Sequence, residues 1–275
     1  MWNAPTDEQL QADIDFAVQT AREAGERLVG LRASERWLDE KILGDVGDQA
    51  ADGYLQGYLR GRYPADGILS EETIDSPERL ERARTWIVDP LDGTKEYRSG
   101  RPDFAVHVAL TIDGQPAVGA VALPALDTVL WGCSLPGRER GGVVGSDTSL
   151  CQGTGEQSGP TRIVVSRSHT PEWVERFAEA YGPTDLVRCG SVGYKASRIL
   201  LGEADLYIHK KGLKEWDTCA PEVVARALGW HVCRIDGSTQ KYNQADPYND
   251  ELVICRPSVV ERALETAVAA GVLAS

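Results

Sequence analysis

The sequence predicts an α/β protein whose first half mixes helices with antiparallel strands and whose second half alternates strands and helices. Three observations carry this prediction. Residues 6–63 hold two helical patterns, residues 105–133 alternate apolar runs with turn residues, and strand-like and helix-like segments alternate after residue 160. With 275 residues, 42% of them hydrophobic, the chain can bury one large core or two moderate ones. We divide it into an α+β half, residues 1–155, and an α/β half, residues 156–275.

The first half begins with a predicted capping box, formed by Thr6 and Gln9. A long amphipathic helix should follow, and a second helix is predicted over residues 48–63, where Pro64 stops it. Short strands are expected at residues 68–69 and 85–88. The turn at Asp113-Gly114 separates two of the predicted antiparallel strands.

The second half begins after a segment rich in Gly, Ser and Pro, which we interpret as a loop or linker over residues 135–160. Apolar runs and helical periodicity then alternate. Strands are predicted at residues 162–166, 186–189 and 206–209, and helices at residues 171–181, 192–201, 218–228 and 258–270.

Charge and cysteine content restrict the class of function. The formal net charge of −13 argues against nucleic-acid polymers and anionic membranes as partners, but allows a small anionic substrate if metal ions supply local positive charge. No apolar run reaches transmembrane length, and the first residues do not resemble a signal peptide. The six cysteines are scattered, as is typical of reduced thiols in a cytoplasmic protein.

The most informative stretch is Asp89-Pro90-Leu91-Asp92-Gly93-Thr94, which follows the apolar run at residues 86–88. This order predicts a buried strand that delivers two carboxylates to its end, where a helix starts. Carboxylates this close repel each other unless a divalent cation lies between them. Further acids next to apolar runs are Asp48, Glu71, Glu72 and Asp217.

Any one of these acids has a simpler interpretation. It can be a solvated turn residue, or a helix cap, as Asp217 would be for a helix that begins at Thr218. The set is harder to explain in this way, because several desolvated acids need a shared counter-charge. All the candidate ligands are oxygens, which points to Mg²⁺ or Mn²⁺ rather than to zinc.

Three motifs in order resemble the inositol monophosphatase superfamily of metal-dependent, lithium-sensitive phosphatases. They are residues 67–72 (GILSEE), 86–94 (WIVDPLDGT) and 215–218 (EWDT). The resemblance covers nearly the whole chain and implies a layered α-β-α-β-α fold, with a metal-binding first half and a substrate-binding second half. Homodimers occur in this superfamily. Within it, residues 92–97, 165–169 and 214–223 look most like 3′(2′),5′-bisphosphate nucleotidases.

The resemblance implies a role for each matching residue. Two or three Mg²⁺ ions, with Mn²⁺ as a substitute, would be held by Glu71, Asp89, the Leu91 carbonyl, Asp92 and Asp217. Thr94, oriented by Asp48, would take the proton of the attacking water, and the Gly93 and Thr94 amides would hold the phosphate. The nucleotide or its second phosphate would contact Ser166, His169, Gly190, Ser191 and Lys195.

Several assignments stay open in the sequence. The usual Thr before the base-orienting Asp is missing, so Asp52 competes with Asp48, which we prefer because it needs no gap before Glu71. Lys195 can serve a phosphate or a solvated helix face. His107 reads as structural. The basic pair Lys210-Lys211, which follows the predicted strand end at His209, can meet a phosphate or lie in an exposed loop, and we prefer the loop.

The expected function is a Mg²⁺-dependent phosphomonoesterase that removes the 3′-phosphate of adenosine 3′,5′-bisphosphate to give AMP. The sulfated analogue 3′-phosphoadenosine 5′-phosphosulfate is a further expected substrate, and the cellular role would be recycling in sulfate assimilation. An inositol monophosphatase or a broad sugar phosphatase acting on fructose 1,6-bisphosphate is the first alternative. A non-catalytic nucleotide or metal sensor is the second. A structural Ca²⁺ module ranks below these, because the acids do not share one loop of EF-hand spacing.

Overall fold

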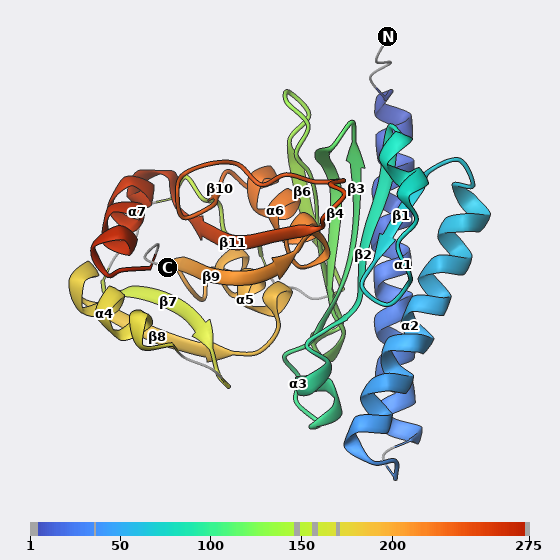
Figure 1. Cartoon of the computed structure of the whole chain (residues 1–275), viewed down its shortest axis with the longest axis horizontal. Helices are drawn as coiled ribbons and strands as arrows, with labels where there is room; N and C mark the ends of the chain where they lie inside the picture. The colour runs from blue at the N-terminus through green and yellow to red at the C-terminus, as the bar shows by residue number, and fades with distance from the viewer. Residues whose placement is uncertain (1–4, 36, 146–148, 156–158, 169–170, 273–275) are drawn as a thin grey trace.

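The computed structural model describes residues 5–35, 37–145, 149–155, 159–168 and 171–272. Its elements stack as a helix pair, a sheet, a second helix pair, a second sheet and a third helix pair (Figure 1). Three hydrophobic cores fill the spaces between successive layers. The predicted α/β class and the layered architecture are confirmed.

The first helix pair is formed by α1 (Asp7–Ser34) and α2 (Glu40–Arg62). The capping box at α1 forms as predicted, with Gln9 N donating to Thr6 Oγ1 at 3.1 Å and Thr6 N donating to Gln9 Oε1 at 2.8 Å. The second helix begins eight residues before the predicted start at residue 48, capped by Asp39. Its glycines concealed the early turns, but Gly47 is needed there, because a Cβ at this position would lie 2.8 Å from a Tyr97 ring carbon.

The first sheet has six strands in sequence order. β1 and β2 run parallel, and every other pair is antiparallel, as predicted for residues 105–133. The prediction of an irregular segment at residues 135–160 was wrong in part, since residues 140–144 form β6 and pair with β5. The Gly-rich composition hid this strand. The strands are β1 (Gly67–Ser70), β2 (Arg84–Asp92), β3 (Ala105–Ile112), β4 (Gln115–Leu123), β5 (Thr128–Cys133) and β6 (Arg140–Val144).

The second sheet has the order β10-β11-β9-β7-β8, in which β7 runs parallel to both β8 and β9. The predicted alternation of strands and helices is confirmed, but two strands near the C-terminus were not predicted. The elements are β7 (Thr161–Ser166), α4 (Glu172–Tyr181), β8 (Thr184–Cys189), α5 (Val192–Leu200), β9 (Leu206–Lys214), α6 (Glu215–Ala227), β10 (His231–Cys233), β11 (Tyr248–Cys255) and α7 (Val260–Ala269).

Short helical turns complete the chain: η1 (Pro77–Glu81), α3 (Thr94–Arg98), η2 (Pro124–Leu126) and η3 (Pro257–Val259). Helices α5 and α6 lie between the two sheets, and α6 contacts strands of both (Figure 1). The division after residue 155 therefore stays a proposal. All six cysteines are free. Among the described residues, no helix is long and apolar enough to cross a membrane.

Candidate active site

Asp89 and Asp92 reach the same side of the first sheet because β2 is irregular between them. Side chains alternate in a regular strand, so residues three apart would point to opposite faces. The pairing of β2 with β3 shifts between Asp89, opposite His107, and Asp92, opposite Ala105. This bulge brings the ligand atoms of Asp89, Asp92 and His107 within 4.8 Å of one another, and all three side chains are buried.

Asp92 is held by the N-terminus of α5, which belongs to the second half of the chain. It accepts hydrogen bonds from Ser191 Oγ at 2.5 Å, Gly193 N at 2.6 Å and Val192 N at 3.0 Å. Burial alone would raise the pKa of Asp92, but His107, Ser191 and the Gly193 amide lower it to about 2. Asp92 is therefore an ionised carboxylate of fixed orientation.

His107 was interpreted from the sequence as structural, yet it contacts the site directly. Its Nε2 lies 3.2 Å from Asp92 Oδ2, and its Nδ1 lies 2.9 Å from the Trp216 carbonyl oxygen. A Cβ at residue 193 would lie 2.0 Å from His107 Nε2, so the site requires glycine there. The fully buried ring thus joins β3 to both α5 and α6.

The predicted metal ligands Glu71, Asp89 and Asp217 lie near Asp92 or near one another, and their carboxylates repel each other. Burial, followed by the charge of Glu71, raises the pKa of Asp89 well above its ordinary value. Burial and the charges of Asp217 and Asp92 raise the pKa of Glu71 to about 8, although its side chain keeps contact with solvent. Burial and Asp92 raise the pKa of Asp217 to about 6. Such a set of mutually repelling oxygen donors fits hard divalent cations.

Asp217 is not the N-cap residue of α6, but its side chain takes part in the capping of this helix. Helix α6 begins at Glu215, so Asp217 is its third residue, and its Oδ2 accepts a hydrogen bond from Lys214 N at 2.7 Å. The sequence prediction of a start at Thr218 was wrong because the Glu-Trp pair continues directly from β9. The half-buried carboxylate lies close enough to Asp92 for the charge of Asp92 to raise its pKa.

Thr94 lies against Asp48 rather than Asp52. Thr94 Oγ1 donates to Asp48 Oδ1 at 3.2 Å and lies 3.3 Å from the Leu91 carbonyl oxygen. Burial and the charge of Glu72 raise the pKa of Asp48 to about 7. Asp52, one turn further along α2, instead accepts hydrogen bonds from Ser70 and Thr73.

The backbone between β2 and α3 turns at Gly93, which has a left-handed φ of 93° and caps α3. A Cβ at this position would lie 3.0 Å from Ser191 Cβ. The first amides of a helix have no partner within it, so the N–H groups at this turn are oriented for an anion.

Three of the predicted substrate contacts lie at the ends of two neighbouring parallel strands of the second sheet. Ser166 ends β7, and Gly190 and Ser191 follow β8. Gly190 packs against Glu96 so closely that a Cβ would lie 2.3 Å from the Glu96 side chain. Lys195 is buried on α5, so the solvated interpretation is wrong for this residue. His169 lies outside the described residues.

Two polar contacts near this side were missed by the sequence analysis. The Arg167 guanidinium forms an ion pair with buried Asp103, which also accepts a hydrogen bond from Gly190 N. His209, predicted at the end of a strand, lies in β9 and is half-buried, with its Nδ1 3.2 Å from Tyr207 Oη. The basic pair Lys210-Lys211 after it belongs to the same strand and not to a loop. In the sequence, the ion pair between Arg167 and Asp103 is indicated only by an acid, Asp103, that stands just before an apolar strand.

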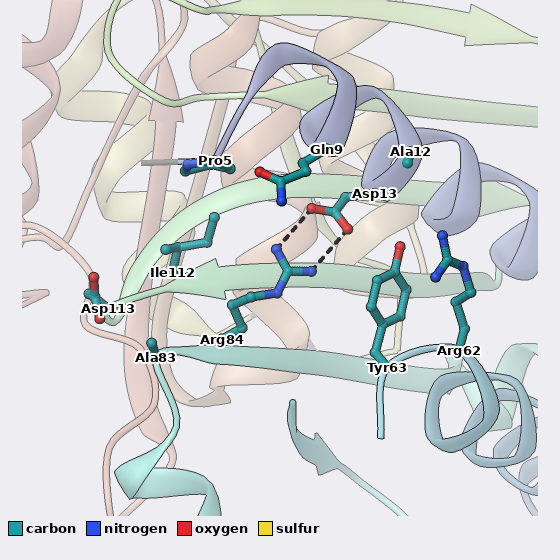
Figure 2. Close-up of a pocket in the computed structure, with 10 residues that line it drawn as sticks. All are labelled: Pro5, Gln9, Ala12, Asp13, Arg62, Tyr63, Ala83, Arg84, Ile112 and Asp113. Carbon is teal, nitrogen blue, oxygen red and sulfur yellow. Dashed lines mark hydrogen bonds and ion pairs between the residues drawn. The ribbon is translucent and has the colours of Figure 1, made fainter. Parts of the chain in front are cut away.

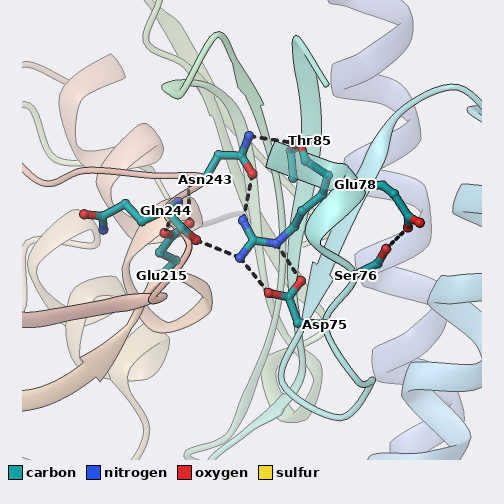
Figure 3. A network of polar contacts seen from close by, with 8 residues as sticks. Asp75, Ser76, Glu78, Thr85, Glu215, Asn243 and Gln244 are labelled. Carbon is teal, nitrogen blue, oxygen red and sulfur yellow. Dashed lines mark hydrogen bonds and ion pairs between the residues drawn. The ribbon is translucent and has the colours of Figure 1, made fainter. Parts of the chain in front are cut away.

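A third missed feature is buried Arg79, which joins the two halves. Figure 3 shows Asp75, Asn243, Gln244 and Glu215 of this polar network. Arg79, in η1, donates to Asp75 at 2.6 and 2.8 Å, to Asn243 Oδ1 at 2.7 Å and to the Gln244 carbonyl at 2.7 Å. The backbone N–H groups of Asn243 and Gln244 donate in turn to the buried Glu215 carboxylate at 2.7 and 2.8 Å. The segment that follows Glu71 is thereby fixed to the start of α6.

A cavity of about 790 Å³ lies away from the carboxylates, between α1, the end of α2 and strands β2 and β3 (Figure 2). Its polar groups are largely paired with each other, because Arg84 donates to both Asp13 oxygens at 2.9 and 3.0 Å and to Asp66. None of the predicted site residues lines it.

Comparisons with known proteins give consistent results. The model of the inositol monophosphatase family matches residues 9–272. The chain is 39% identical over 249 residues to the 3′-phosphoadenosine 5′-phosphate phosphatase of Mycobacterium leprae, covering 90% of each chain. It is 30% identical over 241 residues to the 3′(2′),5′-bisphosphate nucleotidase CysQ of Salmonella typhimurium, covering 86% of this chain and 96% of that protein.

Among solved structures, the fold is similar to that of CysQ from Bacteroides thetaiotaomicron, with a TM-score of 0.77 and 24% identity over 90% of this chain and 97% of that one. It is also similar to SuhB of Mycobacterium tuberculosis, with a TM-score of 0.76 and 22% identity over 97% of this chain and 100% of that one.

Proposed function

The chain belongs to the inositol monophosphatase family, and we propose that it removes the 3′-phosphate of adenosine 3′,5′-bisphosphate to give AMP and inorganic phosphate. The observation that carries this proposal is the contact between the two halves of the chain: Ser191, at the N-terminus of α5, donates to Asp92 of the carboxylate cluster, which lies in the same half as the Thr94–Asp48 pair. The similarity to proteins named as 3′-phosphoadenosine 5′-phosphate phosphatases supports the choice of substrate.

The donor set fits divalent cations, and we assign their binding to Glu71, Asp89, the Leu91 carbonyl, Asp92 and Asp217. We infer two or three Mg²⁺ ions, with Mn²⁺ as a substitute. The raised pKa values of three of these acids support the assignment, because a nearby cation would relieve their mutual repulsion. When bound, such ions supply Lewis-acid activation of water and neutralise charge on the leaving oxygen.

The protein residues move the proton and hold the phosphate. In the proposed reaction, Thr94 Oγ1 accepts a proton from the attacking water while its own proton passes to Asp48. A pKa of about 7 suits Asp48 to this exchange near neutral pH. The new bond joins the water oxygen to phosphorus, and the bond to the 3′-oxygen breaks. The Gly93 and Thr94 amides would hold the phosphate oxygens.

On the second half of the site, Ser166, His169, Gly190, Ser191 and Lys195 are proposed to contact the nucleotide. The position of Glu96 supports this assignment. Glu96 packs against Gly190, and it belongs to residues 92–97, one of the stretches that resemble 3′(2′),5′-bisphosphate nucleotidases. 3′-Phosphoadenosine 5′-phosphosulfate is proposed as a further substrate, and sulfate assimilation as the cellular role. A cytoplasmic location and a homodimer remain predictions.

The substrate proposal is tested by measuring phosphate release from adenosine 3′,5′-bisphosphate, inositol 1-phosphate and fructose 1,6-bisphosphate under one condition. We expect the nucleotide to have the highest kcat/KM. A wide margin in favour of the inositol or sugar phosphate would replace the proposal with the corresponding alternative.

The enzyme proposal is tested separately by Asp92→Asn, which removes the carboxylate that α5 orients. We expect turnover to be lost. Because the Asn NH2 group would face an N–H donor of α5, circular dichroism and urea unfolding should be measured to check that the variant is folded. Turnover at the wild-type rate would contradict the metal assignment, and wild-type protein without turnover on any of the three substrates would favour the sensor alternative.

A further inference from the structure

Lys195 is a buried ammonium with few partners. Its side chain extends from α5, only 5% of the residue surface is exposed, and Nζ donates to Tyr207 Oη at 3.3 Å. An ammonium has three N–H donors, and among the described residues the structure gives that of Lys195 this one hydrogen bond. A buried cation in this state requires an anion or further acceptors. The residue therefore has donor capacity for a ligand.

The Lys195 ammonium is directed by a chain of two further side chains on β9. Tyr207 Oη lies 3.2 Å from His209 Nδ1, and His209 Nε2 lies 3.0 Å from the Lys211 carbonyl oxygen. A carbonyl oxygen can only accept, so Nε2 carries the proton. Burial and the charge of Lys195 lower the pKa of His209 to about 4, so the ring is neutral and Nδ1 accepts.

These assignments give the chain a single direction. Tyr207 must donate its hydroxyl proton to His209, which leaves the lone pairs of the Tyr207 oxygen free to accept from Lys195. The reverse orientation would place two donors against each other. His209 thus fixes the Tyr207 hydroxyl, and the hydroxyl fixes one of the three donors of Lys195. The other two donors keep a defined orientation.

The position of Lys195 indicates which phosphate of a bisphosphate nucleotide it would contact. It lies three residues after Val192, whose amide donates to Asp92, and the charges of Asp92 and Asp217 act on it, so it is close to the carboxylate cluster. The reacting phosphate is assigned to Gly93 and Thr94 in the first half of the chain. Lys195 belongs to the second half, with α5 lying beside β9 (Figure 1). A ligand with two phosphates would have one on each side.

We propose that Tyr207 and His209 are positioning residues that orient the Lys195 ammonium toward the second, non-reacting phosphate of a bisphosphate nucleotide. This inference rests on the proposed function. It makes the hydrogen-bond chain a determinant of specificity, because a substrate without the second phosphate gains nothing from an oriented Lys195.

The test compares adenosine 3′,5′-bisphosphate with 3′-AMP, which lacks the 5′-phosphate. Tyr207→Phe keeps the ring and removes the hydroxyl, and we expect kcat/KM for the bisphosphate to fall about 10-fold, mainly through KM. For 3′-AMP the change should stay within about 2-fold. His209→Leu should behave alike, and His209→Asn should restore much of the loss because its amide oxygen can replace Nδ1 as the acceptor.

Tyr181→Phe is the matched control, since it removes another buried tyrosine hydroxyl, on α4 in the outer core. Tyr181→Phe should leave kcat/KM unchanged for both the bisphosphate and 3′-AMP. Calorimetric binding of AMP and of adenosine gives a readout without turnover. Tyr207→Phe and His209→Leu should weaken AMP binding about 10-fold and leave adenosine binding unchanged.

The outcomes separate the two proposals. Equal losses for the bisphosphate and 3′-AMP, or equal weakening of AMP and adenosine, would overturn the positioning role while the proposed function stands. A wild-type enzyme that hydrolyses the bisphosphate and 3′-AMP equally well would overturn the role of the hydrogen-bond chain in specificity, whereas a wild-type protein that releases no phosphate from the bisphosphate would overturn the proposed function. In that case the binding of AMP and adenosine still decides whether the chain orients Lys195 toward a phosphate.

Discussion

Replacing Asp217 by Asn is expected to stabilise the metal-free protein at alkaline pH, although it removes a proposed metal ligand. Asp217 is half-buried at the start of α6, and burial and the charge of Asp92 raise its pKa from 3.8 to about 6. A carboxyl whose pKa is higher in the folded state contributes stability at low pH. That stability is lost as the pH rises through 6. Asn avoids the loss, and its amide oxygen can still accept from Lys214 N.

The magnitude follows from the two pKa values. One pKa unit corresponds to about 1.4 kcal/mol, so full ionisation of Asp217 at pH 8 costs the folded state about 3 kcal/mol. At pH 5 the unfolded chain is already ionised while the folded protein is mostly protonated, and the same calculation gives about half of that cost. The gain from Asp217→Asn should therefore grow by about 1 to 2 kcal/mol between pH 5 and pH 8.

The assay is urea unfolding with a chelator at pH 5 and pH 8, followed by the same measurement at pH 8 with Mg²⁺. The metal should reverse the sign of the effect, since it stabilises the wild-type protein more than a variant that lacks one ligand. Asp185→Asn, at an exposed position of β8, is the control and should show no such pH dependence. The reasoning is refuted if Asp217→Asn has the same effect on stability at both pH values in chelator.

Three further predictions follow from particular contacts. Asp48→Asn should lower kcat at least 100-fold and abolish the rise of kcat/KM with pH through about 7. Asp52→Asn should change stability more than kcat, because Asp52 accepts hydrogen bonds from Ser70 and Thr73. Comparable losses of kcat in both variants would contradict the assignment. Gly193→Ala should destabilise the protein by at least about 2 kcal/mol in urea unfolding because of the clash with His107, while Gly30→Ala, in open space on α1, should be neutral or stabilising by up to about 1 kcal/mol. Arg79→Met should destabilise by about 3 kcal/mol and weaken Mg²⁺ binding measured by calorimetry, because it frees the segment after Glu71; unchanged metal affinity would limit Arg79 to a structural role.

The sequence predicted the layered α/β class, the capping box of α1, the antiparallel strands at residues 105–133 and the family. These features depend on short-range patterns, since capping, periodicity and motif spacing act within a few residues. The predictions failed where the local pattern was weak. Glycines concealed the first turns of α2, and the Gly-rich composition of residues 140–144 concealed β6, an edge strand whose pairing with β5 is a long-range contact.

For the candidate site, the sequence by itself determined which acids are available and that they are hard oxygen donors. Only the tertiary structure decided how they meet. The irregularity in β2 turns Asp89 and Asp92 to one side, Thr94 lies against Asp48 and not Asp52, and His107, Arg79 and the Lys195–Tyr207–His209 chain join segments far apart in sequence. The physical reason is that register, burial and the partners of a polar group are set by long-range packing, whereas the chemistry of a side chain is a local property.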